Sequence, residues 1–110
     1  MRLDPAVGAE IKKTRPSVIV SNDNSNHALD TLTVVPVTDQ GQRVYPVEAA
    51  VPAGTGGLMK DSKVKCHQIR TVDKKRLVGY LGSLPDHIMD DIERAVSLHL
   101  GIGEGKIHNI

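Results

Sequence analysis

Apolar residues run in short blocks along most of the chain, and each block ends at turn-forming residues. Residues 17–21 and 31–38 are the clearest blocks, and they are closed by the polar runs 22–26 and 39–41. β-Branched side chains dominate both blocks, and such residues favour strands because they pack well on a pleated surface. The pattern predicts two buried strands, the first followed by a loop at 22–26 and the second by a turn.

Weaker strand patterns surround these two blocks. Residues 43–53 carry Pro46 and Pro52, which indicates an edge or irregular strand because proline cannot donate to a hydrogen-bond ladder. Further strands are predicted at 62–71 and 76–81, joined by a polar turn. The first ten residues are typical of the tail of a strand running into a loop.

One stretch has the period of an amphipathic helix. It runs from about Pro85 to Leu100, and its inner positions would be Ile88, Ile92, Ala95, Val96 and His99. Pro85 suits a first helical turn and Gly101 suits a helix end. The glycines beyond Leu100 predict a mobile tail from about residue 101. Strands followed by one such helix predict a mainly β fold, a small barrel or folded sheet capped by the helix.

Length and composition add three limits. A chain of 110 residues fits one domain, 1–110, and the lack of Phe and Trp requires an aliphatic core. A single cysteine excludes an intramolecular disulfide. No apolar run approaches the roughly twenty residues that span a membrane, and no signal-peptide pattern opens the sequence. These features predict a cytoplasmic protein.

The net charge of +1 conceals a segregation of charge. Residues 60–76 hold seven basic side chains against two acidic ones, whereas residues 86–94 hold four acidic side chains against one basic. This favours an anionic partner such as nucleic acid, although a lysine-protected strand edge explains it equally well. The five histidines are scattered, and Cys66 and His67 are neighbours on a predicted strand, pointing to opposite faces. We therefore expect no metal site.

Polar residues gather at the ends of the two best strands. Arg15 precedes the first strand and Thr38 closes the second, and in an antiparallel pair these positions share one end of the sheet. We expect Arg15 and Thr38 to be spatial neighbours. Without further evidence, Arg15 could simply be a charged surface residue and Thr38 a hydroxyl residue in a turn, with no functional site between them.

Ordered motifs make the sequence resemble the MazF/PemK toxin endoribonucleases over about residues 3–100. Three motifs occur in the family's order: Gly8-x-Glu10-(x)4-Arg15-Pro16 with 18–23, then 34–38, then Asp61-Ser62 with 68–77. The resemblance implies an SH3-like antiparallel barrel with a C-terminal helix and a homodimer with an RNA groove around its interface. It also implies a labile antitoxin protein whose acidic tail fills that groove.

The resemblance further implies roles for single residues. Arg15 and Thr38 match the family's catalytic arginine and threonine. Other matching positions are associated with the site or its support: Glu10, Asn22, Ser62 and Gln68. We expect Asn22, Ser62 and Gln68 to contact RNA together with Lys13, which lies in the basic approach to the first motif.

Single-stranded RNA carries its own nucleophile, the 2′-hydroxyl, so its cleavage needs alignment, charge stabilisation and proton transfer but no metal or other cofactor. Arg15 can grip two phosphate oxygens, and Thr38 can donate one hydrogen bond. The pKa of a guanidinium group is above about 12, so Arg15 stays protonated at neutral pH and a different group must act as base. We take Glu10 as the candidate base, and we expect selectivity for a short RNA motif.

Two departures from the family pattern stand out. Family members usually carry a further strand before Leu3-Asp4-Pro5, so we expect the first strand of the barrel to be largely missing and an N-terminally extended version to be more stable. The strand after Ser62 carries Lys63 and Lys65, so we expect it to be more exposed or to face RNA. Two other functions remain open, a non-catalytic SH3-like interaction module and a topoisomerase-poisoning toxin of related fold.

Overall fold

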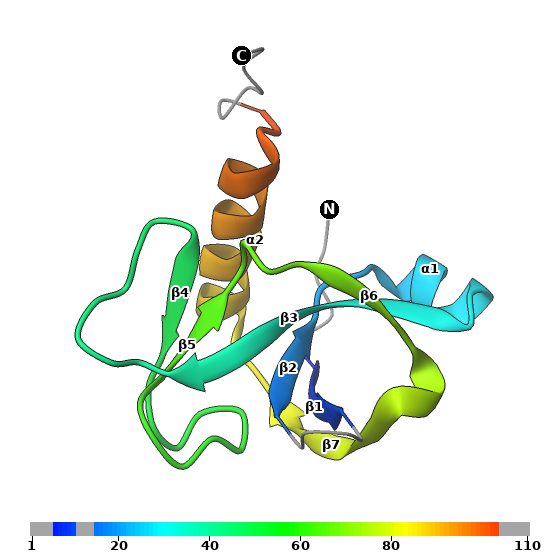
Figure 1. The fold of residues 1–110 in the computed structure, drawn as a ribbon, viewed down its shortest axis with the longest axis horizontal. Coiled ribbons are helices and arrows are strands. Elements are labelled where there is room, and N and C mark those ends of the chain that lie inside the picture. Colours follow the sequence, from blue (N-terminus) through cyan, green and yellow to red (C-terminus); the bar gives the residue numbers. More distant parts are fainter. Residues whose placement is uncertain (1–5, 11–14, 104–110) are drawn as a thin grey trace.

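A computed structural model describes residues 6–10 and 15–103 (Figure 1). In chain order these residues form β1 (Ala6–Glu10), β2 (Pro16–Ile19), α1 (Asp23–Ala28), β3 (Thr31–Asp39), β4 (Glu48–Val51), β5 (Ser62–Lys65), β6 (Arg70–Asp73), the 3-10 turn η1 (Lys74–Arg76), β7 (Leu77–Ser83) and α2 (Asp86–Leu100). The predicted mainly β fold with one long C-terminal helix is confirmed.

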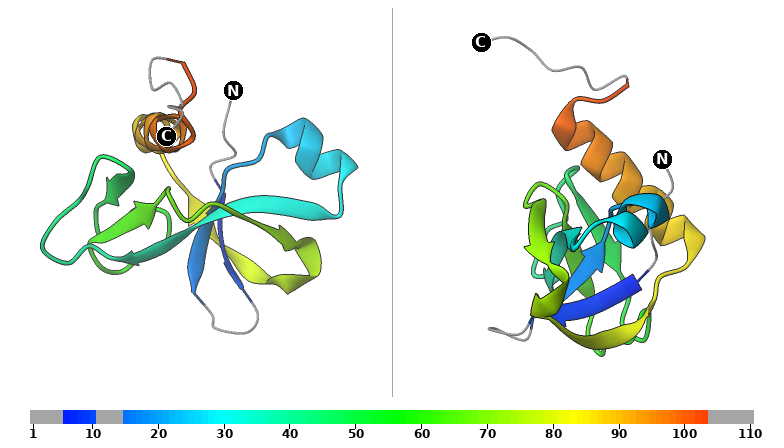
Figure 2. Two further views of the ribbon diagram at one scale, coloured as in Figure 1. Left: turned by 45° about the horizontal axis from the view of Figure 1, so that its top comes forward. Right: turned by 90° about the vertical axis from the view of Figure 1, so that its right-hand side faces the viewer.

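The long strand β3 organises an antiparallel sheet with the strand order β4-β5-β3-β2-β1-β7. One edge of β3 pairs with β6 and then with β5, while the other edge pairs with β2. Figure 1 shows β1, β2, β3, β6 and β7 curling into a small ring, whereas β4 and β5 turn away beneath α2. The two views in Figure 2 show α2 lying across one side of the sheet.

Two aliphatic clusters hold these layers together. The larger lies between α2 and the strands, and its fully covered members include Val18, Val35, Val51, Val64 and Ile92. The smaller cluster lies within the curled part of the sheet and is built from Leu32, Val34 and Val72, with Ile19 and Leu77 packed against it. The larger cluster packs against one side of β3 and β5, and the smaller cluster covers the other side of β3 near its start, so the end of β3 at Thr38 and Asp39 is left for a site.

The predicted helix is confirmed with one correction. Pro85 occupies the N-cap position of α2, and Gly101 ends the helix in a left-handed conformation with a φ of 68°. Ile88, Met89, Ile92, Ala95 and Val96 are its buried residues, so the predicted inner position of His99 is wrong. His99 falls in the last turn of α2 and is exposed, on the side of the helix away from the core cluster against which Leu100 packs.

The loop predicted at 22–26 is wrong, because residues 23–28 form α1. Asn22 caps this helix, and its side-chain oxygen accepts a hydrogen bond from the backbone N–H of Ser25 at 2.8 Å. Asn, Asp and Ser favour turns and helix N-caps for the same reason, since their side chains bond nearby backbone groups. The short helix buries none of its residues, so no apolar period marked it.

The strand predicted at 62–71 is divided into β5 and β6, both paired with the same edge of β3. A turn separates the two halves and holds Cys66 and His67, which therefore do not alternate along a strand as predicted. The edge strand predicted at 43–53 is shorter, because only β4 is extended, and it does lie at the edge of the sheet.

The prediction for the N-terminal part needs the largest correction. Residues 6–10 are not a strand tail entering a loop, since they form a strand that pairs with both β2 and β7. β1 lies between β2 and β7 in the sheet. The family strand expected before Leu3 falls outside the described residues, so the expectation that it is largely missing stays a prediction. Most of the tail predicted to be mobile, residues 104–110, lies outside the described residues.

Candidate active site

Arg15 and Thr38 meet at one end of the β2–β3 pair, as the antiparallel arrangement predicted. Ser17 pairs with Pro36, so the start of β2 lies beside the end of β3. The two side chains line an open cleft of about 420 Å³. The cleft is also lined by three polar residues and one methionine: Asp39, Lys60, Ser62 and Met59. The cleft therefore joins two strand ends to a loop that sequence reasoning did not connect with them.

That loop spans residues 52–61 and its shape depends on glycine. Gly57 has a φ of +78°, and a Cβ added there would lie 2.3 Å from the carbonyl oxygen of Leu81 in β7. The backbones of the loop and of β7 thus approach more closely than a side chain allows. The next residue, Leu58, is buried in the larger core cluster, and Met59 is exposed at the rim of the cleft.

Two side chains anchor the same loop at its ends. The carboxylate of Asp61 accepts the backbone N–H of Ala53 at 2.9 Å. The buried hydroxyl of Ser62 donates to the carbonyl oxygen of Lys60 at 2.8 Å. We expected Ser62 to contact RNA. Its hydroxyl instead donates its hydrogen bond within the loop, and this bond shapes the wall of the cleft beneath Lys60.

The charges around the cleft suit a phosphate group. Arg15 and Lys60 are exposed cations on its rim, and Asp39 is the carboxylate among the described lining residues. Lys63 lies directly across from Thr38 in the β3–β5 ladder, so both side chains leave the sheet on the same face. The prediction that the strand after Ser62 is more exposed holds only in part, since Val64 is fully buried and Lys63 is largely covered.

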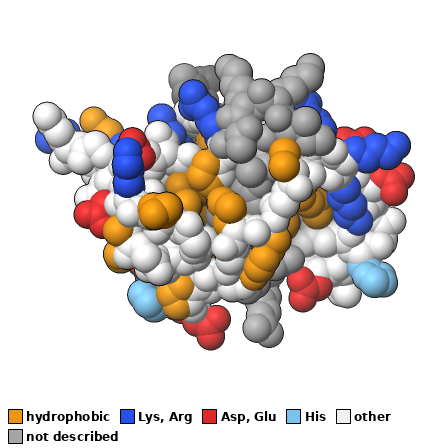
Figure 3. All heavy atoms as spheres, turned by 90° about the horizontal axis from the view of Figure 1, so that it is seen from below, with side chains coloured by type: hydrophobic (Ala, Val, Ile, Leu, Met, Phe, Trp, Pro, Cys, Tyr) orange, Lys and Arg blue, Asp and Glu red, His pale blue; other side chains and the backbone are white. Residues whose placement is uncertain are grey.

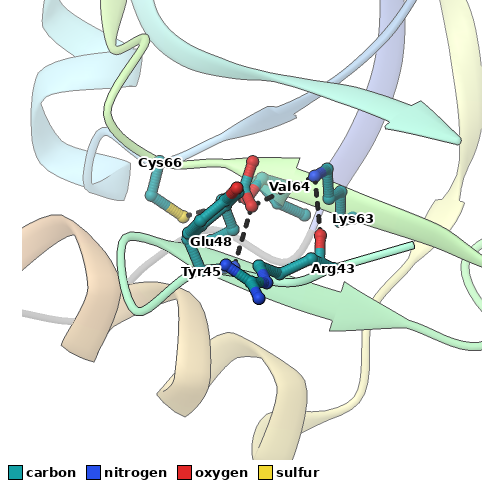
Figure 4. Close-up of polar contacts among 6 residues, drawn as sticks. All are labelled: Arg43, Tyr45, Glu48, Lys63, Val64 and Cys66. Carbon is teal, nitrogen blue, oxygen red and sulfur yellow. Dashed lines mark hydrogen bonds and ion pairs between the residues drawn. The ribbon is translucent and has the colours of Figure 1, made fainter. Parts of the chain in front are cut away.

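A buried ion pair lies next to this face (Figure 4). Lys63 Nζ is 3.1 Å from Glu48 Oε1 and donates to the carbonyl oxygen of Arg43 at 2.9 Å. The Glu48 carboxylate also accepts the backbone N–H of Tyr45 at 2.9 Å. Burial alone would raise the pKa of Glu48, but the Tyr45 N–H and the charges of Lys63 and His67 together lower it below its ordinary value. Glu48 is therefore ionised and pins the β3–β4 loop to β5.

Cys66 and His67 follow β5 on the inner side of the molecule. Burial, with the charge of Glu48 adding to it, raises the pKa of the Cys66 thiol to about 12. A thiol of that kind is neither a nucleophile nor a metal ligand at neutral pH. The ring of His67 stands edge-on to that of His99, with 6.2 Å between ring centroids. Within residues 15–103, no three His, Cys, Asp or Glu side chains are grouped so as to hold a metal ion.

Of the other predicted site residues, Asn22 and Gln68 do not line the cleft. Asn22 lies at the opposite end of β2, where it caps α1 and borders a separate apolar hollow. Gln68 is exposed in the turn between β5 and β6. The backbone of Glu10 ends β1 opposite Leu77, and so Glu10 is not on a loop as expected. Lys13 lies outside the described residues.

Sequence reasoning missed Asp39, Met59, Lys60, Glu48 and Lys63. Lys63 could have been found by extending the register from Thr38 across the neighbouring strand. Asp39 follows Thr38 directly in β3, and Glu48 opens β4. Met59 and Lys60 depend on how the loop 52–61 folds back over the sheet, which local patterns do not encode. Among the described residues, no helix has the length and apolar character needed to cross a membrane.

Comparisons with known proteins agree with this geometry. A profile of PemK-like, MazF-like toxins of type II toxin-antitoxin systems matches residues 1–100. Endoribonuclease MazF9 of Mycobacterium tuberculosis is 38% identical over 105 residues, which cover 91% of this chain and 89% of the relative. Endoribonuclease EndoA of Bacillus subtilis is 34% identical over 101 residues, with coverage of 91% and 87%.

The fold agrees with the same group of proteins. A solved endoribonuclease from a mycobacterial species, in complex with its cognate antitoxin, superposes with a TM-score of 0.80 at 25% identity. The match covers 94% of this chain and 98% of that one.

Proposed function

This chain belongs to the PemK-like, MazF-like toxin family of type II toxin-antitoxin systems, and we propose that it is a toxin endoribonuclease that cuts single-stranded RNA in the cytoplasm. The observation that carries the proposal is the meeting of Arg15 and Thr38 in one open cleft with a cationic rim. The names of its relatives MazF9 and EndoA support the same activity.

The cleft residues supply what internal cleavage of RNA requires. The 2′-hydroxyl attacks the adjacent phosphorus, a P–O bond to the 2′ oxygen forms, and the bond to the 5′ oxygen of the next nucleotide breaks. Arg15 can bond two non-bridging oxygens at once and Thr38 can donate to one, so both stabilise the charge that grows on the phosphorane-like transition state. No step in this scheme calls for a metal.

Two protons must also move. We assign the base that accepts the 2′-hydroxyl proton to Glu10, and Arg15 or water protonates the leaving oxygen. Asp39 is the competing carboxylate, because it lines the cleft. The pH profile separates the two. Only the substitution of the true base, Glu10→Gln or Asp39→Asn, should remove the acidic limb from the dependence of kcat/KM on pH.

RNA binding extends beyond the reacting phosphate. We propose that Lys13 and Gln68 contact the backbone of the strand on either side of the cut. Ser62 supports Lys60 through the loop hydrogen bond, and Asn22 acts on the binding surface only through the cap of α1. The chain is proposed to read a short unpaired motif, because unpaired bases expose their edges to loop side chains.

We further propose that two copies of the chain form a homodimer and that an antitoxin protein inhibits it. Val78, Tyr80 and Leu81 are exposed on β7, where apolar side chains gather (Figure 3). A surface of that kind favours burial against a second copy. The solved mycobacterial relative is in complex with its cognate antitoxin, which supports a protein inhibitor here as well.

The proposal is tested by incubating the protein with a mixed single-stranded RNA in EDTA. We expect the wild type to cut it and Arg15→Ala and Thr38→Ala to lose at least about tenfold in rate, since removing one charge-stabilising donor typically costs about 100-fold or more. Arg94→Ala and Thr31→Ala are matched controls away from the cleft, and we expect both to cut normally. Intact RNA with the wild type would favour an interaction module or a topoisomerase poison instead.

A further inference from the structure

The β3–β4 loop, residues 40–47, carries an arrangement that the cleavage chemistry does not use. Tyr45 is 50% exposed although it is one of only two aromatic residues other than histidine in the chain. The Arg43 guanidinium lies 5.5 Å and Lys63 Nζ 5.7 Å from the centre of its ring. An aromatic ring flanked by two cations is a surface that attracts an anionic, flat ligand.

Hydrogen bonds also hold the backbone of Tyr45 in place. The Tyr45 N–H donates to Glu48, and its carbonyl oxygen accepts the Glu48 N–H at 2.8 Å. Lys63 ties the neighbouring Arg43 to β5 through the Arg43 carbonyl oxygen. Figure 4 shows Tyr45 and Lys63 both bonded to the Glu48 carboxylate, and Lys63 also bonded to the Arg43 carbonyl oxygen. The buried ion pair therefore fixes the backbone of the loop and leaves the tyrosine ring half open to solvent.

The position of this surface relates it to the cleft. Gln42, Arg43, Tyr45 and Lys63 line a hollow of about 530 Å³. Lys63 also lies opposite Thr38, and side chains directly opposite each other in an antiparallel pair have their Cβ atoms about 5 Å apart. A strand of RNA whose phosphate lies at Arg15 and Thr38 thus has a neighbouring nucleotide within reach of the hollow.

We propose that this hollow is a nucleotide subsite in which Tyr45 stacks on one unpaired base while the Arg43 guanidinium binds its phosphate. The proposal rests on the proposed endoribonuclease activity and adds a residue that selects an unpaired nucleotide beside the cut. RNA is favoured over an acidic peptide because a carboxylate would use the Arg43 cation but not the face of the ring. The hollow is lined by no carboxylate among the described residues, since Glu48 is buried beneath it.

The test uses an RNA oligonucleotide that spans a cut site mapped with the wild-type protein, made uncleavable by 2′-deoxy substitution of the scissile nucleotide. Abasic residues are placed at successive positions, and binding is measured with wild type, Tyr45→Phe and Tyr45→Leu. At one position beside the cut, the abasic change should weaken binding to wild type and Tyr45→Phe about tenfold. The same change should cost Tyr45→Leu less than about twofold, because the stacking partner is already gone.

Controls separate stacking from folding and from charge. Leu29→Ala removes a similarly exposed apolar side chain, and it should keep the wild-type pattern. Arg43→Ala should weaken all the oligonucleotides uniformly and reduce the salt dependence of binding. Thermal melts should show that Tyr45→Leu remains folded. Tyr45→Phe, which keeps the aromatic ring, should bind the oligonucleotides as tightly as the wild type does.

Three results would overturn the subsite. Equal abasic penalties in wild type and Tyr45→Leu, with RNA cleavage intact, would refute the stacking role and leave the endoribonuclease proposal standing. A peptide of alternating Asp and Glu is the second probe. If it binds Tyr45→Leu more weakly than the wild type while RNA binding is unchanged, the surface belongs to a protein partner. If the wild type cuts no RNA, both proposals fail together.

Discussion

Replacing Glu48 by Gln tests whether the buried ion pair holds the β3–β4 loop. The Glu48 side chain is 2% exposed and that of Lys63 is 14% exposed, so neither charge is well solvated. The amide retains the size of the carboxylate and can still accept the Tyr45 N–H, but it leaves the Lys63 ammonium without a counter-charge. Breaking a fully buried pair costs about 3–5 kcal/mol. Since Lys63 is partly exposed and keeps its bond to Arg43, we expect a loss of about 2 kcal/mol.

The pH dependence of this loss follows from the lowered pKa of Glu48. A carboxyl whose pKa is lower in the folded state contributes stability above its unfolded value, 4.5, and that contribution disappears as the pH falls through the folded pKa. The stability difference between wild type and Glu48→Gln should therefore be complete at neutral pH and shrink in acid.

Urea unfolding at neutral pH and well below pH 4.5 measures both effects. The double variant Glu48→Gln/Lys63→Met is the control, because removing both charges should recover most of the stability lost by Glu48→Gln alone. Equal stability of wild type and Glu48→Gln at neutral pH would refute the anchoring role. A difference that stays constant with pH would show that the charge of Glu48 is not its cause.

Three further outcomes are expected. Ile92→Ala, at a fully buried position of α2, should lose about 3 kcal/mol in denaturant unfolding, whereas Leu98→Ala on the exposed side should lose less than about 0.5 kcal/mol. Gly57→Ala should slow RNA cleavage and lower the melting temperature because its Cβ meets Leu81, whereas Gly41→Ala has no atom within 4 Å and should cost only about 1 kcal/mol. Iodoacetamide should label Cys66 at neutral pH only after unfolding, and fast labelling of the folded chain, measured by mass spectrometry, would contradict its burial.

Strong periodicity made part of the fold predictable. α2 was predicted because its buried side repeats with the period of a helix, and β2 and β3 because each is a run of β-branched residues closed by turn-forming residues. α1 was missed because all of its residues are at least partly exposed, and β5 and β6 were merged because the turn between them has no glycine or proline. Residues 6–10 were predicted only as the tail of a strand, although they form the full strand β1. This strand pairs with β2 and with β7, and β7 lies about 70 residues away in the sequence.

The candidate site was predictable only where it follows from strand register. Antiparallel pairing brought Arg15 to Thr38 without any knowledge of the loops. Lys60 and Met59 reach the cleft through the close approach of Gly57 to β7, which is a contact between distant parts of the chain. The burial of Glu48 depends on the same kind of long-range packing, so a glutamate beside a proline-flanked edge strand gave no local sign of it.

The end groups of the RNA fragments test the central claim most directly. Attack by the internal 2′-hydroxyl in the Arg15–Thr38 cleft leaves a 2′,3′-cyclic phosphate on one fragment and a 5′-hydroxyl on the other, and the reaction should proceed in EDTA. Mass spectrometry of the fragments from an oligonucleotide cut by the wild type identifies both ends. Fragments with a 3′-hydroxyl and a 5′-phosphate, formed only when a divalent cation is added, would show that an activated water cuts the strand and would contradict the account.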